Sequence, residues 1–140
     1  MAMLHNARRG STMVEFGLIG VLFFALLIGI LDFGQFLFVQ QAIVERARTA
    51  ARWGAVHDPT DSESIRNMVL YLQATAPSGQ SPSFGLTPSM VTVSAPDAGT
   101  DDYRLLIQVS GYSFAALSPY LAGCYKGSPV SVSVPLGQYR

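Results

Sequence analysis

The N-terminal segment places a basic pair, a glycine and a carboxylate at the entrance to a long apolar run. The order is Arg8-Arg9-Gly10-Ser11-Thr12-Met13-Val14-Glu15-Phe16, and apolar residues dominate the next two dozen positions. A carboxylate at the mouth of a membrane span is costly and needs a physical reason. Thr12 and Glu15 have the spacing of a capping box, and the helix dipole also favours an acid in the first turn. Capping explains these two residues but not the glycine between the arginines and the helix.

The same order resembles the processing site of type IV prepilins. In that family a short basic leader stays in the cytoplasm, a prepilin peptidase cuts after a glycine, and the fifth mature residue is glutamate. The resemblance implies a cut between Gly10 and Ser11, with Arg8 and Arg9 in the leader and Glu15-Phe16 as the acidic-aromatic pair. A glycine suits this role because it lets an extended backbone enter a narrow active site. The capping and processing interpretations are compatible.

Composition predicts a membrane anchor. Charged residues make up 13% of the 140 residues, against about a quarter in typical soluble domains. Between Phe16 and Val39 the only charge is Asp32, and this stretch exceeds the ~20 apolar residues that span a bilayer. It is too long for a secretory signal and lacks the small-residue cleavage site of one. The arginines before it predict a cytoplasmic N-terminus and an extracytoplasmic C-terminus.

The span carries features that suit helix packing. Glu15 and Asp32 are about 25 Å apart along a helix, so each can lie near one interface of the bilayer. Ala25 and Gly29 form a pair of small residues four positions apart, and Asp32 projects from the same face. This pattern predicts a packing face for another helix. The alternative is that glycine is simply common in membrane helices.

Beyond the span the pattern predicts a small α+β domain. No proline interrupts the chain from Ser11 to Asp58, so the helix should continue to about residue 56. A stripe of small and apolar residues marks its outer half: Ile43, Ala47, Ala50, Ala51 and Gly54. A short second helix should follow a capping box at Thr60-Asp61-Ser62-Glu63 and close at Pro77-Ser78-Gly79. Alternation with a period of two predicts three antiparallel strands, around residues 91–94, 105–110 and 130–134.

The expected organisation is a leader at residues 1–10, a long helix at 11–56 and an extracytoplasmic domain at 57–140. We expect a hairpin loop at residues 95–102 and a longer connection at 113–128 with a helical turn around 114–121. Cys124 is the sole cysteine. It could be buried, free or bridged to a partner, and an inert thiol is expected. The stripe on the long helix should pack against the apolar face of the sheet.

Taken together, these motifs resemble the TadE-like pseudopilins, minor components of tight-adherence (Tad, or Flp) pilus systems. The resemblance rests on residues 9–16, on Asp32-Phe33-Gly34 and on Gln41-Ala42 leading into residues 50–55. The terminal strand departs from the family pattern, because residues 135–140 lack the expected arginine-acid pair. The resemblance implies a subunit of the bacterial inner membrane that acts in initiating or priming pilus assembly. Its partners would be the prepilin peptidase, other pilins or pseudopilins and the pilus assembly platform.

Other classes of function fit less well. His57 and Asp58 are neighbours in sequence, which makes no catalytic triad without a nucleophile placed in space, and no phosphate loop or metal-ligand spacing is present. The chain is therefore not expected to be an enzyme or to need a cofactor or a metal. Its formal net charge of zero argues against nucleic acid as a partner. The serious alternative is a single-pass anchored binding or scaffold protein whose outer domain binds a ligand or partner and which never enters a filament.

Overall fold

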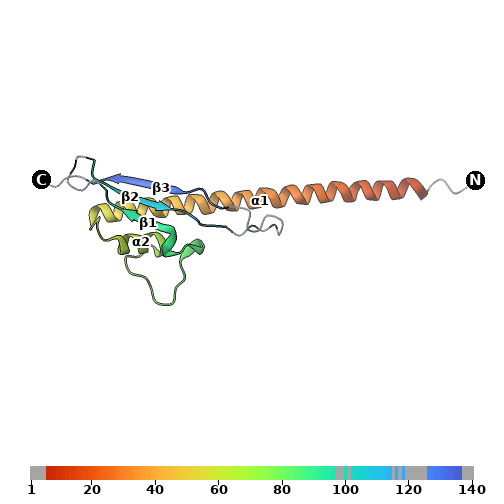
Figure 1. Ribbon diagram of the computed structural model, residues 1–140. Helices are drawn as coiled ribbons and strands as arrows, with labels where there is room; N and C mark the ends of the chain where they lie inside the picture. Colours follow the sequence, from red (N-terminus) through yellow and green to blue (C-terminus); the bar gives the residue numbers. More distant parts are fainter. Residues whose placement is uncertain are drawn as a thin grey trace, which may run out of the picture.

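A single long helix is the spine of the molecule. The computed structural model describes residues 6–96, 100, 102–114, 116, 118 and 126–136, and helix α1 runs through Asn6–Val56. Its 51 residues make it about 77 Å long. One half of α1 stands alone, and the other half carries a small layer of sheet and helix (Figure 1). The α+β fold predicted from the sequence is confirmed.

Helix α1 begins earlier than expected, which makes the predicted capping box at Thr12 wrong. The helix already includes Asn6 to Gly10, so Thr12 and Glu15 lie in its interior rather than in its first turn. Alanine and arginine are good helix formers, and one glycine costs only about 1 kcal/mol. Helical structure therefore extends through the basic pair into the segment assigned to the leader.

The chain after α1, from residue 57 on, forms a short helix and a three-stranded meander, which we call the outer domain. Helix α2 spans Ser62–Tyr71, β1 Val91–Ser94, β2 Arg104–Val109 and β3 Val130–Pro135. The sheet order is β1-β2-β3 with both pairs antiparallel, and Val93, Ile107 and Val132 lie side by side in register. The three strands are confirmed. Two short 3-10 turns, Ser83–Gly85 and Pro88–Met90, connect α2 to the sheet.

Helix α2 differs from its prediction at both ends. Its N-cap is Asp61, whose carboxylate accepts a hydrogen bond from the Ser64 backbone N–H at 3.0 Å, so Thr60 is not the cap. Hydrogen bonds from Ser64 lower the pKa of Asp61. The helix ends at Tyr71, well before Pro77, because Leu72 turns into the left-handed region with φ 59° and donates its N–H to Met68. The residues between Leu72 and Pro77, which the predicted helix would include, therefore lie outside it.

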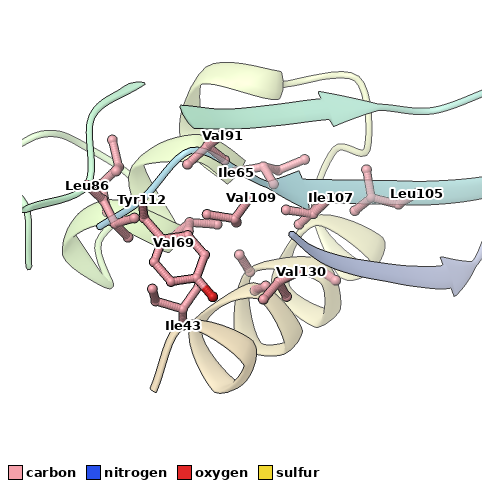
Figure 2. Packing of buried hydrophobic residues seen from close by; sticks show 14 of the residues in the cluster. Ile43, Ile65, Val69, Leu86, Val91, Leu105, Ile107, Val109, Tyr112 and Val130 are labelled. Atoms are coloured by element: carbon pink, nitrogen blue, oxygen red, sulfur yellow. The ribbon is translucent and has the colours of Figure 1, made fainter. Parts of the chain in front are cut away.

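The core forms where α1, α2 and the sheet meet. The predicted stripe on α1 is buried, with Ile43, Ala47, Ala50 and Ala51 fully covered. Figure 2 shows Ile43 of α1, Val69 of α2 and Val130 of β3 in one cluster, with the Tyr112 ring next to Ile43 and residues of β1 and β2 above. At Gly54 an added Cβ would lie 2.8 Å from side-chain atoms of both Ile65 and Leu105. Small residues are needed here because they let the helix axis approach the sheet closely.

The two ends of the segment that connects β2 to β3 pair with each other. Ser113 and Lys126 form an isolated antiparallel bridge, and the Gly127 N–H donates to the Tyr112 carbonyl at 2.9 Å. The buried Tyr112 hydroxyl donates to the Ser128 carbonyl at 2.9 Å. Most of the predicted turn at 114–121 lies outside the described residues. Cys124 and part of the 95–102 loop also lie outside them.

Overpacking the stripe should unfold the outer domain. Replacing Ala50, which is fully buried, with Trp forces a large ring between α1 and the sheet, at a cost of about 1–3 kcal/mol. We expect Ala50→Trp to become protease-sensitive outside the membrane while still inserting normally. Thr49→Trp is the matched control, because Thr49 is exposed on the neighbouring face. A protease-resistant Ala50→Trp domain would contradict the packing described here.

Candidate functional site

The predicted processing segment lies on the free end of α1. Arg8, Arg9, Gly10 and Ser11 are all in helical backbone. Next to them, the side chain of Phe16 is 78% exposed and Glu15 is also exposed. The part of the chain that the structure describes brings no other element to this segment (Figure 1). From Thr12 onward this end of α1 is therefore exposed in the isolated subunit.

The apolar half of α1 is uncovered. From Met13 to Leu31 its large hydrophobic side chains are between 42% and 81% exposed, an apolar surface far larger than a soluble monomer presents to water. Of the helices that the structure describes, α1 is the one long and apolar enough to cross a membrane, with a mean hydropathy of 2.6 in its most apolar window. This surface requires lipid or other helices as its surroundings.

The three residues of the predicted packing face have different environments. A Cβ added at Gly29 would meet nothing within 4 Å, and Ala25 is exposed, so both leave room for a partner helix. Asp32 is only 4% exposed, and its carboxylate accepts a hydrogen bond from the Ser118 backbone N–H at 3.2 Å. The chain's own outer domain thus covers Asp32. The packing face at Ala25 and Gly29 stays a prediction, and Asp32 marks the point where the domain meets the span.

Two pairs of aromatic rings add to the contact between α1 and the outer domain, on the C-terminal side of Asp32. Phe36 of α1 lies 5.1 Å from Phe114, and Phe38 lies 6.4 Å from Phe84, measured between ring centroids. Phe114 follows β2, whereas Phe84 belongs to the first 3-10 turn. Two separate segments of the outer domain therefore contact α1 within six residues of Asp32.

Arg46 links α1 to the C-terminal end of helix α2. Its guanidinium donates to the carbonyls of Val69 at 3.4 Å and Leu70 at 3.2 Å, and to the Ser83 hydroxyl at 3.0 Å. It also lies over the Phe84 ring, 5.2 Å from the centroid. The carbonyls at a helix C-terminus lack partners within the helix. Arg46 supplies these partners, and burial lowers its pKa without removing its charge.

Removing the Arg46 guanidinium should destabilise the outer domain. Arg46→Met keeps most of the aliphatic stem but leaves part-buried carbonyls at the end of α2 without their donor. We expect a loss of about 1–3 kcal/mol in the free energy of unfolding of the detergent-solubilised chain, measured by denaturant titration. Arg48→Met is the control, because Arg48 makes an exposed 2.8 Å ion pair with Glu45, and such pairs contribute about 0–1 kcal/mol. Equal losses in both variants would contradict the capping role.

The residues considered for catalysis have structural contacts instead. His57 stacks on Trp53 at 4.2 Å and donates from Nδ1 to the Trp53 carbonyl at 3.0 Å. Asp58 accepts hydrogen bonds from the Thr60 backbone and hydroxyl, and these lower its pKa. Among the residues described, no group of three or more His, Cys, Asp or Glu side chains could hold a metal ion.

Sequence reasoning did not find the contacts of Arg46 and Asp32. Arg46 lies beside the stripe, one turn before Ala50. Its position next to a buried face could have indicated that this cation is partly buried. The partner of Asp32 lies 86 residues further along the chain, and no local pattern points to Ser118.

The fold and the free helix define a protein with one candidate membrane span and a small α+β domain on its outer half. Residues 10–52 match the family model described as TadE-like protein. The resemblance predicted from the sequence is thereby confirmed over this segment, and the TadE-like family is associated with Tad pili. TadE-like proteins are in general not enzymes. No curated protein and no solved structure matches the chain.

Proposed function

We propose that the chain is a minor pseudopilin that a prepilin peptidase processes after Gly10 and that acts in the initiation or priming of Tad pilus assembly. The observation that carries this proposal is the extent of the family match. It begins at residue 10 and covers the free apolar half of α1. That half exposes Glu15 and Phe16 and has the uncovered apolar surface that a subunit needs if it is to leave lipid for a bundle of helices.

Processing would require local unwinding of α1. The segment Asn6–Gly10 is helical, whereas a peptidase takes its substrate as extended backbone. Glycine in a helix interior costs about 1 kcal/mol relative to alanine, and it adopts extended conformations without steric cost. Gly10 would therefore be the weak point at which the leader separates from the rest of the helix.

Cleavage would also give Glu15 a partner. The new α-amino group at Ser11 is a cation at a helix N-terminus, where the helix dipole disfavours positive charge. Glu15 lies four residues later, one helical turn away and on the same face. Its carboxylate can offset that charge within the chain or in an adjacent subunit. We propose that this pairing guides docking and register more than it adds net stability.

The corresponding topology has residues 1–10 as a cytoplasmic leader, residues 11–56 as the helix and residues 57–140 as the extracytoplasmic domain. Arg8 and Arg9 on the cytoplasmic side agree with the positive-inside tendency. The subunit would sit in the bacterial inner membrane before assembly. Its partners would be the prepilin peptidase, other pilins or pseudopilins and the assembly platform.

The intact mass of the membrane-extracted protein tests this function. The chain should begin at Ser11 in cells with their own prepilin peptidase and should be full length in cells that lack it. A chain that keeps residues 1–10 in the presence of the peptidase would contradict the proposal. It would favour the alternative, a single-pass anchored binding or scaffold protein that never enters a filament.

A further inference from the structure

A pocket lies at the base of the outer domain, where that domain meets the end of the apolar span. Its volume is about 470 Å³, within the range of small-molecule sites. We call it the basal pocket. It is lined by Gln35, Phe38, Val39, Phe84, Gly85, Ser113 and Phe114.

The level of the basal pocket in the bilayer follows from the length of the span. With Glu15 at the inner boundary, the ~30 Å of hydrocarbon requires ~20 helical residues and ends near Gln35. The headgroup layer adds ~5–8 Å on each side. Gln35, Phe38 and Val39 therefore lie in the layer of lipid esters and headgroups. The basal pocket continues the apolar surface of the span into that layer.

The lining of the basal pocket is aromatic and polar but carries no charged side chain among the residues described. Three phenylalanine rings form apolar walls, and Gln35 and Ser113 supply hydrogen-bonding groups. The nearby cation, Arg46, is already engaged with two carbonyls and a hydroxyl. The pocket therefore suits a group of mixed polarity without net charge, and it has no means of selecting a headgroup by its charge.

The backbone of the first 3-10 turn places the Phe84 ring in the wall of the basal pocket. Phe84 adopts φ 59°, in the left-handed region, and Gly85 follows at φ 64°. A non-glycine residue is strained in this region and persists there only where its surroundings fix it. The Arg46 guanidinium lies over the Phe84 ring, and the Phe38 ring forms a T-shaped pair with it. The ring is thus fixed next to Phe38, which is 67% exposed.

We propose that the basal pocket holds the glycerol-ester region of one outer-leaflet phospholipid. This region of a lipid combines apolar carbon with neutral ester oxygens, which matches the lining, and it lies at the level derived for Gln35 and Val39. The bound lipid fills the space between the span and the outer domain while the subunit waits in the membrane. The inference rests on the membrane placement in the proposed function.

A photoreactive benzophenone amino acid at Phe84 tests the occupant in the full-length protein in native membranes. Phe84 belongs to the outer domain, so its adducts report on the pocket rather than on lipid around α1. Irradiation should yield subunits whose intact mass has increased by one phospholipid, with zwitterionic and anionic lipids captured in proportion to their abundance. Adducts to another protein, or no adduct, would overturn the proposal.

Filling the basal pocket should reduce the yield of that adduct. Val39→Phe should lower the lipid yield about tenfold, equivalent to ~1.4 kcal/mol of lost binding. Leu37→Phe is the matched control: it adds a ring at the same height on another face of α1, where Leu37 lines a different hollow. Phe38→Ala, at an exposed position, provides a second variant that removes one wall without crowding the core. An unchanged yield in both Val39→Phe and Phe38→Ala would refute the lipid site.

The same mass spectra separate this inference from the proposed function. A chain that begins at Ser11 but captures no lipid leaves processing intact and removes the lipid site. A chain that captures lipid but keeps residues 1–10 supports the lipid site and contradicts processing after Gly10.

Discussion

The Gly10→Val variant should accumulate in the membrane as the full-length chain. A branched side chain at Gly10 would obstruct the extended path that the substrate backbone takes into the peptidase, and it would remove the flexibility that lets the helical leader unwind. Displacing reacting atoms by as little as 1 Å can slow a reaction by about 10²-fold. We therefore expect no product that begins at Ser11 on the timescale of normal processing, as measured by intact mass.

Gly17→Val is the control for this experiment. Gly17 lies on the same helix, and an added Cβ there would meet nothing within 4 Å. It introduces the same branched residue into the apolar helix without touching the cleavage segment. This variant should be cut normally. A Gly10→Val chain that is shortened to the wild-type product would show that the cut lies elsewhere.

The Glu15→Ala variant should be cleaved normally and yet fail to support pilus assembly. Glu15 is exposed, and the described part of the chain gives its carboxylate no structural task that its removal would disturb. Its proposed role arises only after cleavage, when it meets the Ser11 amine as the helix leaves lipid. A loss of ~1.4 kcal/mol in a docking step lowers the population of docked subunits tenfold. We expect pili per cell to fall by at least about tenfold, counted by electron microscopy.

Glu45→Ala is the matched control for Glu15→Ala, because it removes a carboxylate from the same helix. Glu45 makes an exposed ion pair with Arg48, of a kind that contributes little. Its loss should leave both cleavage and piliation unchanged. Normal piliation from Glu15→Ala would remove the assembly role of this acid altogether, since the structure has no helix N-terminus at Thr12 for it to cap.

The elements of the fold were predictable where local periodicity carries the information. In a strand, successive side chains point to opposite faces, so the alternation of valine and serine in β3 reports its buried face directly. In a helix, residues three and four apart share a face, so Ile43, Ala47 and Ala50 predicted the surface that meets the sheet. The apolar run of α1 likewise predicted a span from length and composition alone.

The ends of the helices were less predictable, because they depend on contacts from elsewhere in the chain. Helix α2 stops at Tyr71 rather than near Pro77, and its last carbonyls are satisfied by Arg46 of α1. Helix α1 starts upstream of Thr12, where no other element of the described residues lies against it. A capping motif states a local preference, and the surrounding structure decides whether the helix uses it.

The junction between span and domain was decided by tertiary structure alone. Asp32 looked like part of a helix-packing face, yet the Ser118 backbone N–H reaches it from 86 residues away. The basal pocket likewise combines residues of α1, of the first 3-10 turn and of the segment after β2. The sequence by itself determined the span, the strands, the buried stripe and the family resemblance, because each follows from the spacing of nearby residues. Which polar groups meet across the fold depends on how those elements pack, and spacing along the chain carries no record of it.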